Sequence, residues 1–534
     1  MQGAFDYVIV GAGSAGCALA ARLSEDPATR VLLLEAGGEG RRIDVALPMA
    51  VAKLWPNPNL TWGYQTEPEP ELSGRRLPVA RGRMLGGTSA LNGMMAIRGH
   101  AADYDAWAAQ GLPGWDWASV LPYFRKLERH WRGDTAEHGG QGPVSVEPHP
   151  APSPLIGPAR EAAAALGYPL TDDFNGAATD GFGMPDFTIR KGRRASTARA
   201  YLDAARRRPN LALETDAFVE RVIVDSRRAT GVRYRKGGEV RHAVARREVI
   251  LAAGAIASPQ LLLLSGIGPA TDLQRHGIPV IADRVEVGRN LMDHPGCGLE
   301  MMLDRRWAFE ENLRFDRLAR AFADWTLRGK GMMGAPPLAI SANVASAPGD
   351  PAVDLHFLLV PLAMESKVWF PLVRRRHGPR LSAMWSLNYP KSRGSLALAS
   401  GDPAAHPAIH LALLSDERDR AAMVHGYRVL RELLRQPALA AATGEVMTRP
   451  VPEPQTDDEI LAYVRANAMT AYHPSGTCRM GGDEASVVDG ELRVRGVDAL
   501  RVIDASVFPL LPGGNTNLPV IMVAEKGADL IKAG

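Results

Sequence analysis

A glycine-rich turn between two short apolar runs, close to the start of the chain, limits the fold more than any other sequence feature. The run from Phe5 to Val10 is typical of a short buried strand, and Ala12 to Leu23 of a helix of small residues. A second apolar run, Val31 to Leu34, is followed at once by Glu35. Strand, glycine turn, helix, strand and acid in this order predict a β-α-β unit that binds a dinucleotide.

The spacing of the glycines fits the shape of a pyrophosphate. Gly11 permits a tight turn, Gly13 lets the backbone approach the phosphates, and Gly16 lets the helix pack closely on the strand. The helix then presents the positive end of its dipole to the phosphates. Glu35 can accept hydrogen bonds from the adenosine ribose, and its charge disfavours the 2′-phosphate of NADP. These residues alone do not separate NAD from FAD.

Size and charge narrow the class of protein. A chain of 534 residues is too long for one compact core, so we expect two domains. The formal net charge of +3 and the scattered arginines give no reason to expect a nucleic-acid partner. The oligomeric state is left open.

The cysteines and the apolar runs bear on the compartment. Cys17, Cys297 and Cys478 are far apart, so we expect neither a disulfide framework nor a zinc site, which favours a reducing compartment. The first predicted strand begins at Phe5 and leaves no room for a signal peptide. No apolar run approaches the roughly 20 residues that a spanning helix needs. We therefore expect a soluble cytoplasmic protein, with peripheral contact with the inner membrane left open.

Three later segments favour FAD. Arg81 to Asn92 is a glycine-rich loop. Val249 to Gln260 is typical of a strand that runs into a helix, and Leu264 to Pro269 closes that unit. Near the end, Leu500 to Ser506 contains a strand whose Asp504 could approach a pyrophosphate or a ribityl chain.

With these segments in place, the chain closely resembles the glucose–methanol–choline (GMC) oxidoreductase family from residue 5 to about residue 531. Arg81 to Asn92 and Gly254 to Pro269 resemble its two signature motifs, and His473 to Gly481 resembles its catalytic histidine segment. The match looks closest to the bacterial alcohol and choline dehydrogenase branch. The resemblance implies an α/β (overall α+β) chain: a Rossmann-like FAD-binding domain, discontinuous in sequence, beside a substrate-binding domain built on an antiparallel sheet plus helices.

The resemblance divides the chain into five segments. The FAD-binding domain is expected to comprise residues 1–152, 196–297 and 466–534, and the substrate-binding domain residues 153–195 and 298–465. Strands of the second sheet are predicted at Asp354–Val360, Ser382–Asn388 and Ser395–Ala399, and helical spacing runs from Leu411 to Leu434. Residues 134–158 and 345–352 are predicted to be loops.

The expected cofactor-binding residues come from the fingerprint, the signature loops and the C-terminal segments. They are Gly11, Gly13, Ser14, Ala15, Gly16, Glu35, Ala36, Arg83, Gly86, Gly87, Thr88, Asn92, Gly93, Val219, Ala253, Gly254, Asp504, Ala505, Asn515 and Thr516.

Oxidation of an alcohol by hydride transfer needs a base for the hydroxyl proton and an α-carbon hydrogen that faces flavin N5. Histidine suits the first task because its ordinary pKa lies near 6.5. The resemblance places His473 in that role and Asn515 opposite it, where an amide can orient the substrate oxygen. Asn517 is the expected cap of a helix from Pro519 to Leu530, whose N-terminus would face the flavin.

The sequence departs from one part of the family pattern. Some members attach FAD through a histidine in the first signature, and the matching residue here is Leu91, so we expect non-covalent FAD. The sequence has no G-x-S-x-G elbow and no H-E-x-x-H motif, so neither a hydrolase nor a metal site is expected.

The finer function stays open between alternatives. The leading hypothesis is a dehydrogenase that oxidises an alcohol to the aldehyde and passes electrons to a quinone-like acceptor. An alcohol oxidase that uses O2 and releases H2O2 shares every motif. A non-redox lyase or a light-driven decarboxylase on the same scaffold is the remote alternative. The sequence does not decide between an aliphatic alcohol, an aromatic alcohol and choline.

Overall fold

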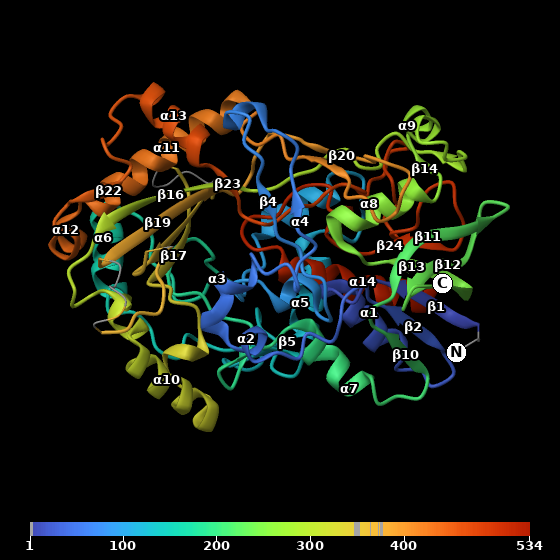
Figure 1. Ribbon diagram of the computed structural model, residues 1–534, viewed down its shortest axis with the longest axis horizontal. Coiled ribbons are helices and arrows are strands. Elements are labelled where there is room, and N and C mark those ends of the chain that lie inside the picture. The colour runs from blue at the N-terminus through green and yellow to red at the C-terminus, as the bar shows by residue number, and fades with distance from the viewer. Residues whose placement is uncertain (1–3, 347–352, 364, 372, 374–377) are drawn as a thin grey trace.

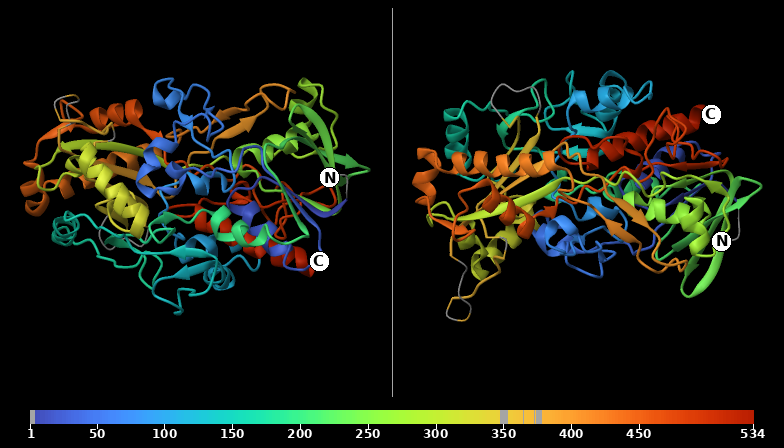
Figure 2. Two further views of the ribbon diagram at one scale, coloured as in Figure 1. Left: turned by 60° about the horizontal axis from the view of Figure 1, so that its bottom comes forward. Right: turned by 90° about the horizontal axis from the view of Figure 1, so that it is seen from above.

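Two seven-stranded sheets dominate the described part of the chain and lie on opposite sides of Figure 1. The computed structural model describes residues 4–346, 353–363, 365–371, 373 and 378–534. The sheet on the right of the view holds the first strands of the chain, and both termini lie on that side (Figures 1 and 2).

The first sheet is parallel at its centre. Its strand order is β10-β2-β1-β13-β12-β11, with β24 also paired to β13. The parallel strands are β1 (Phe5–Val10), β2 (Val31–Leu34), β10 (Leu211–Glu214), β24 (Leu500–Val502) and the last part of β13 (Glu239–Leu251). The first part of β13 pairs antiparallel with β12 (Arg228–Lys236), which pairs with β11 (Phe218–Asp225). The carboxyl ends of the parallel strands meet at one edge, where open α/β sheets bind ligands.

Three helices begin at this edge. α1 (Ser14–Leu23) follows β1, α8 (Gly254–Leu264) follows β13, and α14 (Asn517–Ala533) packs along α1. Gly11 has φ +97°, and a Cβ added at Gly16 would lie 1.8 Å from the carbonyl oxygen of Gly11. The tight turn and the close helix contact expected of these two glycines are both present.

A buried carboxylate fixes α14 against α1. The Glu525 side chain is fully buried, and its oxygens accept hydrogen bonds from Arg22 Nε at 2.8 Å and Tyr201 Oη at 2.7 Å. At the other end of the helix pair, Ser14 Oγ donates to Asn517 Oδ1 at 2.8 Å. The first and last long helices of the chain are thus joined at both ends.

The second sheet is antiparallel throughout. Its order is β22-β16-β19-β18-β17-β7, with β23 paired to β16. These strands are β7 (Gly181–Gly183), β16 (Pro295–Met302), β17 (Ile340–Val344), β18 (Leu355–Val360), β19 (Arg380–Leu387), β22 (Met447–Arg449) and β23 (Met469–Thr470). α11 (Glu417–Leu434) packs against β19. β16 lies across the boundary expected at residues 297 and 298, and that division of the chain stays a prediction.

Most predicted elements are confirmed, and four details differ. The helix expected from Ala12 begins at Ser14, and the one expected from Pro519 begins at Asn517 with Thr516 as its cap. Residues 134–158 include β6 (Val144–Val146) and the start of α6 (Ile156–Ala165). β20 (Ser395–Ala397) pairs only with β21 (Ala408–His410), in a separate two-stranded sheet. Of the loop predicted at 345–352, all but the first two residues lie outside the described residues.

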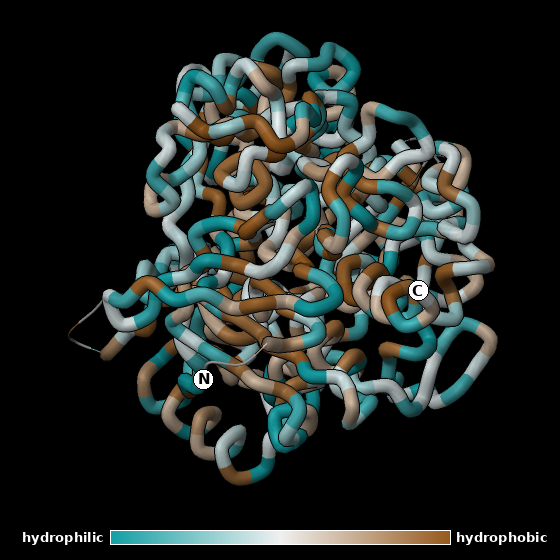
Figure 3. The backbone as a smooth tube through the Cα atoms, turned by 90° about the vertical axis from the view of Figure 1, so that its right-hand side faces the viewer, coloured by the Kyte–Doolittle hydropathy of each residue, from teal (hydrophilic) through white to brown (hydrophobic). Residues whose placement is uncertain are grey.

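Apolar segments gather inside the molecule and hydrophilic ones at its periphery (Figure 3). The described helices include none with the length and hydropathy required to cross a bilayer.

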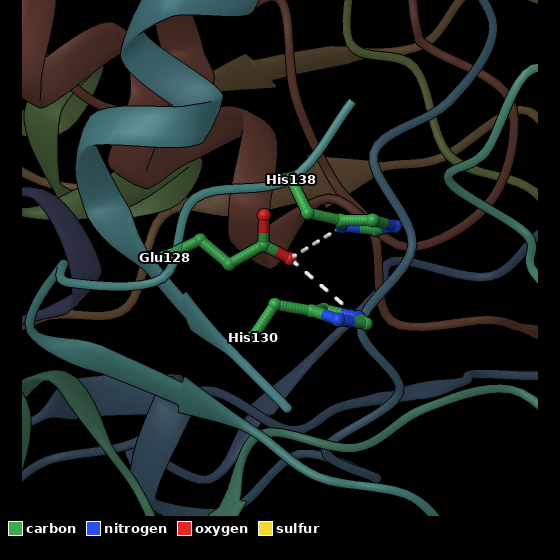
Figure 4. Close-up of side chains that lie close together, drawn as sticks. All are labelled: Glu128, His130 and His138. Atoms are coloured by element: carbon green, nitrogen blue, oxygen red, sulfur yellow. Dashed lines mark hydrogen bonds and ion pairs between the residues drawn. The ribbon is translucent and has the colours of Figure 1, made fainter. Parts of the chain in front are cut away.

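A buried ionic cluster lies beside the first signature loop. Glu128, His130 and His138 offer ligand atoms within 4.8 Å of one another (Figure 4). Arg98 pairs with Glu128, and His138 Nε2 lies 2.8 Å from Asp173 Oδ2. Burial opposes protonation of His138, but its hydrogen bonds to Asp173 and Glu128 prevail and raise its pKa to about 9. Because Arg98 and protonated His138 already compensate the Glu128 charge, the cluster is balanced without an ion. That the protein holds no metal stays a prediction.

The raised pKa of His138 makes the stability of the fold depend on pH. Its contribution is complete below the ordinary pKa near 6.5 and is lost as the pH rises through about 9. We expect the free energy of unfolding, measured by denaturant titration, to fall between pH 6.5 and 9.5 by on the order of 2–3 kcal/mol more in the wild type than in His138→Gln. An equal fall in the two proteins would contradict this role of His138.

Candidate active site

A cavity of about 910 Å³ opens at the carboxyl edge of the first sheet and runs from the glycine turn after β1 to the segment around His473. Eighteen of the expected site positions line it: Gly11, Gly13, Ser14, Ala15, Glu35, Ala36, Arg83, Gly87, Thr88, Asn92, Gly93, Val219, Ala253, Gly254, Asp504, Ala505, Thr516 and the residue shared by the cofactor and catalytic sets, Asn515. His473 lines the same cavity. Segments up to 500 residues apart in sequence therefore share one site.

Two expected cofactor residues lie outside this lining. Gly16 faces the backbone of Gly11, as described above. Gly86 has φ +90°, and its amide donates to the carbonyl oxygen of Ala12 at 2.8 Å. Both glycines shape the walls of the cavity through backbone packing and do not face its interior.

The end of the cavity at the first sheet suits an anion. The N-termini of α1, α8 and α14 all line it, so three helix dipoles present their positive ends there. A Cβ added at Gly254 would meet no atom within 4 Å, so the cavity has room for a ligand directly against the backbone. These features fit a pyrophosphate.

Glu35 lies where a ribose would be held. Its carboxylate accepts hydrogen bonds from the backbone amides of Ala12 at 2.9 Å and Gly37 at 2.8 Å, which fix its orientation. Burial outweighs these hydrogen bonds and raises the pKa of Glu35 to about 7. A partly protonated carboxyl can both donate to and accept from a ribose hydroxyl.

The Asp504 carboxylate is hydrogen-bonded mainly to other groups of the protein. It accepts hydrogen bonds from the Gly254 amide at 2.8 Å and from the hydroxyls of Ser258 and Ser506. It thereby fixes the N-terminus of α8 beside the cavity and lines the cavity itself.

At the far end of the cavity, the side chains of His473 and Asn515 are in contact. Asn515 Nδ2 donates to His473 Nε2 at 3.3 Å, and Asn515 Oδ1 is buried without a partner. Burial, together with the neighbouring His294, lowers the pKa of His473 well below its ordinary value. His473 is therefore a neutral imidazole at pH 7, and the free Asn515 oxygen marks a place for a ligand that donates a hydrogen bond.

Sequence reasoning missed two neighbours of His473. His294 Nδ1 lies 2.9 Å from His473 Nδ1, and Asp293 Oδ1 accepts a hydrogen bond from the His473 amide at 2.9 Å. The available signal was the pair of titratable residues at 293 and 294, immediately before the apolar strand β16.

The loop that carries Asn515 is held by residues from both halves of the molecule. Asp103 Oδ2 accepts hydrogen bonds from the amides of His100 and Gly513, each at 2.8 Å. Asn388, which follows β19, accepts a hydrogen bond from the Gly514 amide at 3.2 Å. The position of Asn515 thus depends on the hydrogen bonds that Asp103 and Asn388 accept from the two residues before it.

The comparisons with known proteins agree with this geometry. The two sequence models of the GMC oxidoreductase family match residues 5–296 and 390–524. The oxygen-dependent choline dehydrogenase of Burkholderia multivorans is 42% identical over 533 residues, which cover 99% of this chain and 93% of that protein. The corresponding protein of Burkholderia thailandensis is 43% identical over 535 residues, with 99% and 94% covered.

Solved structures show the same fold. The crystal structure of pyridoxine 4-oxidase from Mesorbium loti has a TM-score of 0.89 and 31% identity, with 99% of each chain covered. Formate oxidase of Aspergillus oryzae, in a variant made to examine FAD modification, has a TM-score of 0.91 and 29% identity, with 100% of this chain and 99% of that chain covered. The chain therefore belongs to the GMC oxidoreductase family and is an FAD-dependent oxidoreductase.

Proposed function

We propose that this protein oxidises an alcohol to the aldehyde, with His473 as the base and Asn515 as the group that orients the alcohol oxygen. The observation that carries the proposal is the contact between His473 Nε2 and Asn515 Nδ2 at the end of the FAD cavity, with the second Asn515 polar atom unpaired. A hydroxyl placed there can donate toward His473 and accept from the Asn515 amide.

The hydrogen bonds around His473 support its role as a proton acceptor. Burial lowers the pKa of His294 to about 3, so both histidines are neutral at pH 7. Because the Asn515 amide donates to His473 Nε2, the neutral His473 ring carries its proton on Nδ1. His473 Nδ1–H then donates to His294 Nδ1, and the lone pair on His473 Nε2, which accepts from the Asn515 amide, is the one that would take the substrate proton.

The cofactor fits the remaining surfaces of the cavity. Its pyrophosphate would be held by the N-termini of α1 and α14 and its ribose by Glu35. FAD supplies the electron-poor ring that accepts the hydride. The protein's own contribution is to orient the alcohol, to remove its proton and to exclude water from a buried site.

Removal of the base tests the proposal. We expect His473→Ala to keep FAD, judged by its visible absorbance, and to lower the anaerobic rate of flavin reduction by an alcohol about 10²- to 10⁴-fold. His425→Ala is the matched control, because His425 is exposed and bonds only a backbone carbonyl at the surface. An unchanged rate in His473→Ala would exclude His473 as the base.

The mode of FAD attachment is a second test. Leu91 lines the cavity and has no nucleophilic atom, and we propose that FAD is bound without a covalent link. Precipitation with acid should release all of the yellow colour into the supernatant. Colour retained in a washed pellet, at one flavin per chain, would contradict non-covalent binding.

The identity of the electron acceptor provides a third test. We propose a quinone-like acceptor, with oxygen as the alternative that the printed names of the relatives support: an oxygen-dependent dehydrogenase and two oxidases. Turnover should be fast with a soluble quinone and slow in air alone. Hydrogen peroxide formed in equal amount to the aldehyde, at the same rate as with the quinone, would make the protein an oxidase.

A further inference from the structure

We infer, resting on the proposed function, that the alcohol carries an extended apolar body and no cationic head group, and that a second cavity beside His473 holds that body. The inference is independent of the electron acceptor and of how FAD is attached.

The second cavity adjoins the active site directly. It has a volume of about 550 Å³, and Trp55, Gly93, Met95 and Leu358 line both it and the cavity that contains His473. The Trp55 ring lies 5.4 Å from the ring of Tyr472, the residue before His473, so a substrate whose hydroxyl lies at His473 can extend past Trp55 into the second cavity. The volume lies within the range of pockets that enclose small organic ligands.

The chemistry of the lining selects for an apolar group. Among the described residues that form it, Lys53 and Ser366 are the only ones with polar side chains apart from the indole of Trp55, and none carries a carboxylate. Five aromatic side chains also line the cavity and could contact either an alkyl group or a cation: Trp55, Phe187, Phe309, Phe315 and Phe322. The absence of a carboxylate among the described lining residues and the positive charge of Lys53 disfavour a quaternary ammonium there. Burial of an alkyl or arylalkyl group is favoured without any specific partner.

One wall of this cavity is the apolar face of helix α10 (Phe315–Arg328), and this face is partly exposed to solvent. Phe315, Leu318, Ala319 and Phe322 of α10 follow the i, i+3, i+4, i+7 pattern and all line the cavity. Phe315 is nevertheless 54% exposed and Phe322 36%. An apolar substrate in the cavity would cover this face, which ordinary core packing leaves open.

The nearest buried carboxylate is Glu310, next to the lining residue Phe309. Its Oε1 accepts hydrogen bonds from the amides of Ala363 and Arg380, and burial raises its pKa, which favours the uncharged form. Its Oε2 has no partner, and Glu310 is not among the lining residues. Removal of the Glu310 carboxylate therefore distinguishes a cation site from an apolar one.

The test measures anaerobic flavin reduction with straight-chain primary alcohols of increasing length and with choline. We expect the second-order rate constant to rise about fourfold for each added methylene until the cavity is filled, and choline to lie below 1-hexanol. Binding is measured separately by calorimetry with 2-methyl-2-alkanols, which carry no hydrogen on the alcohol carbon. Their dissociation constants should fall by the same factor per methylene.

Two leucines of α10 provide a matched pair of variants. Leu318→Glu places a carboxylate in the cavity, while Leu327→Glu makes the same change where the side chain is 83% exposed. We expect Leu318→Glu to abolish the gain with chain length while the FAD content stays that of the wild type. Leu327→Glu should behave as wild type, and Glu310→Gln should not affect the chain-length series.

The outcomes separate the inference from the function on which it rests. Choline as the best substrate, with a large loss in Glu310→Gln, would overturn the inference and leave alcohol oxidation intact. A flat chain-length series, or equal effects of the two leucine variants, would also overturn it. Failure of every alcohol to reduce the flavin would instead refute the proposed function, whereas graded binding of the 2-methyl-2-alkanols would still support the apolar cavity.

Discussion

The buried carboxylate of Glu525 is the interaction on which the site depends most. It lies on the last helix, is fully buried and is bonded by Arg22 of the first helix and by Tyr201. A buried charge is tolerated only when it is paired, and loss of one partner typically costs several kcal/mol. The position of α14 is therefore strongly specified, and with it the place where Thr516 and Asn515 enter the cavity.

The two ends of the long cavity differ in their electrostatics. At the sheet, three helix N-termini supply positive potential for phosphates, and the Arg83 side chain also lines the cavity. At the other end, burial holds His473 and His294 neutral, and the nearby charge of Arg81 further lowers the pKa of His473. The mainly apolar second cavity adjoins this end.

Much of the cofactor site could be predicted because it depends on local backbone geometry. The glycine turn from Gly11 to Gly16 and Glu35 directly after β2 are recognisable from spacing alone, and the structure places them as expected. The contacts of His473 with His294 and of Gly513 with Asp103 were not predictable, because each joins segments more than 170 residues apart. The second cavity could not be predicted from the sequence either. Apolar residues follow the same sequence pattern whether they fill a core or line a cavity.

The hydrogen bond from Ser14 to Asn517 spans almost the whole chain and has a consequence for biosynthesis. The glycine turn leaves the ribosome early, but the helix that completes the cavity emerges some 500 residues later. At ordinary rates of translation this delay is on the order of a minute. The parallel sheet also needs β24, so until then the nascent chain exposes an unpaired strand edge on β13 and an incomplete nucleotide site. A complete site for FAD therefore forms only after the last helix has been synthesised.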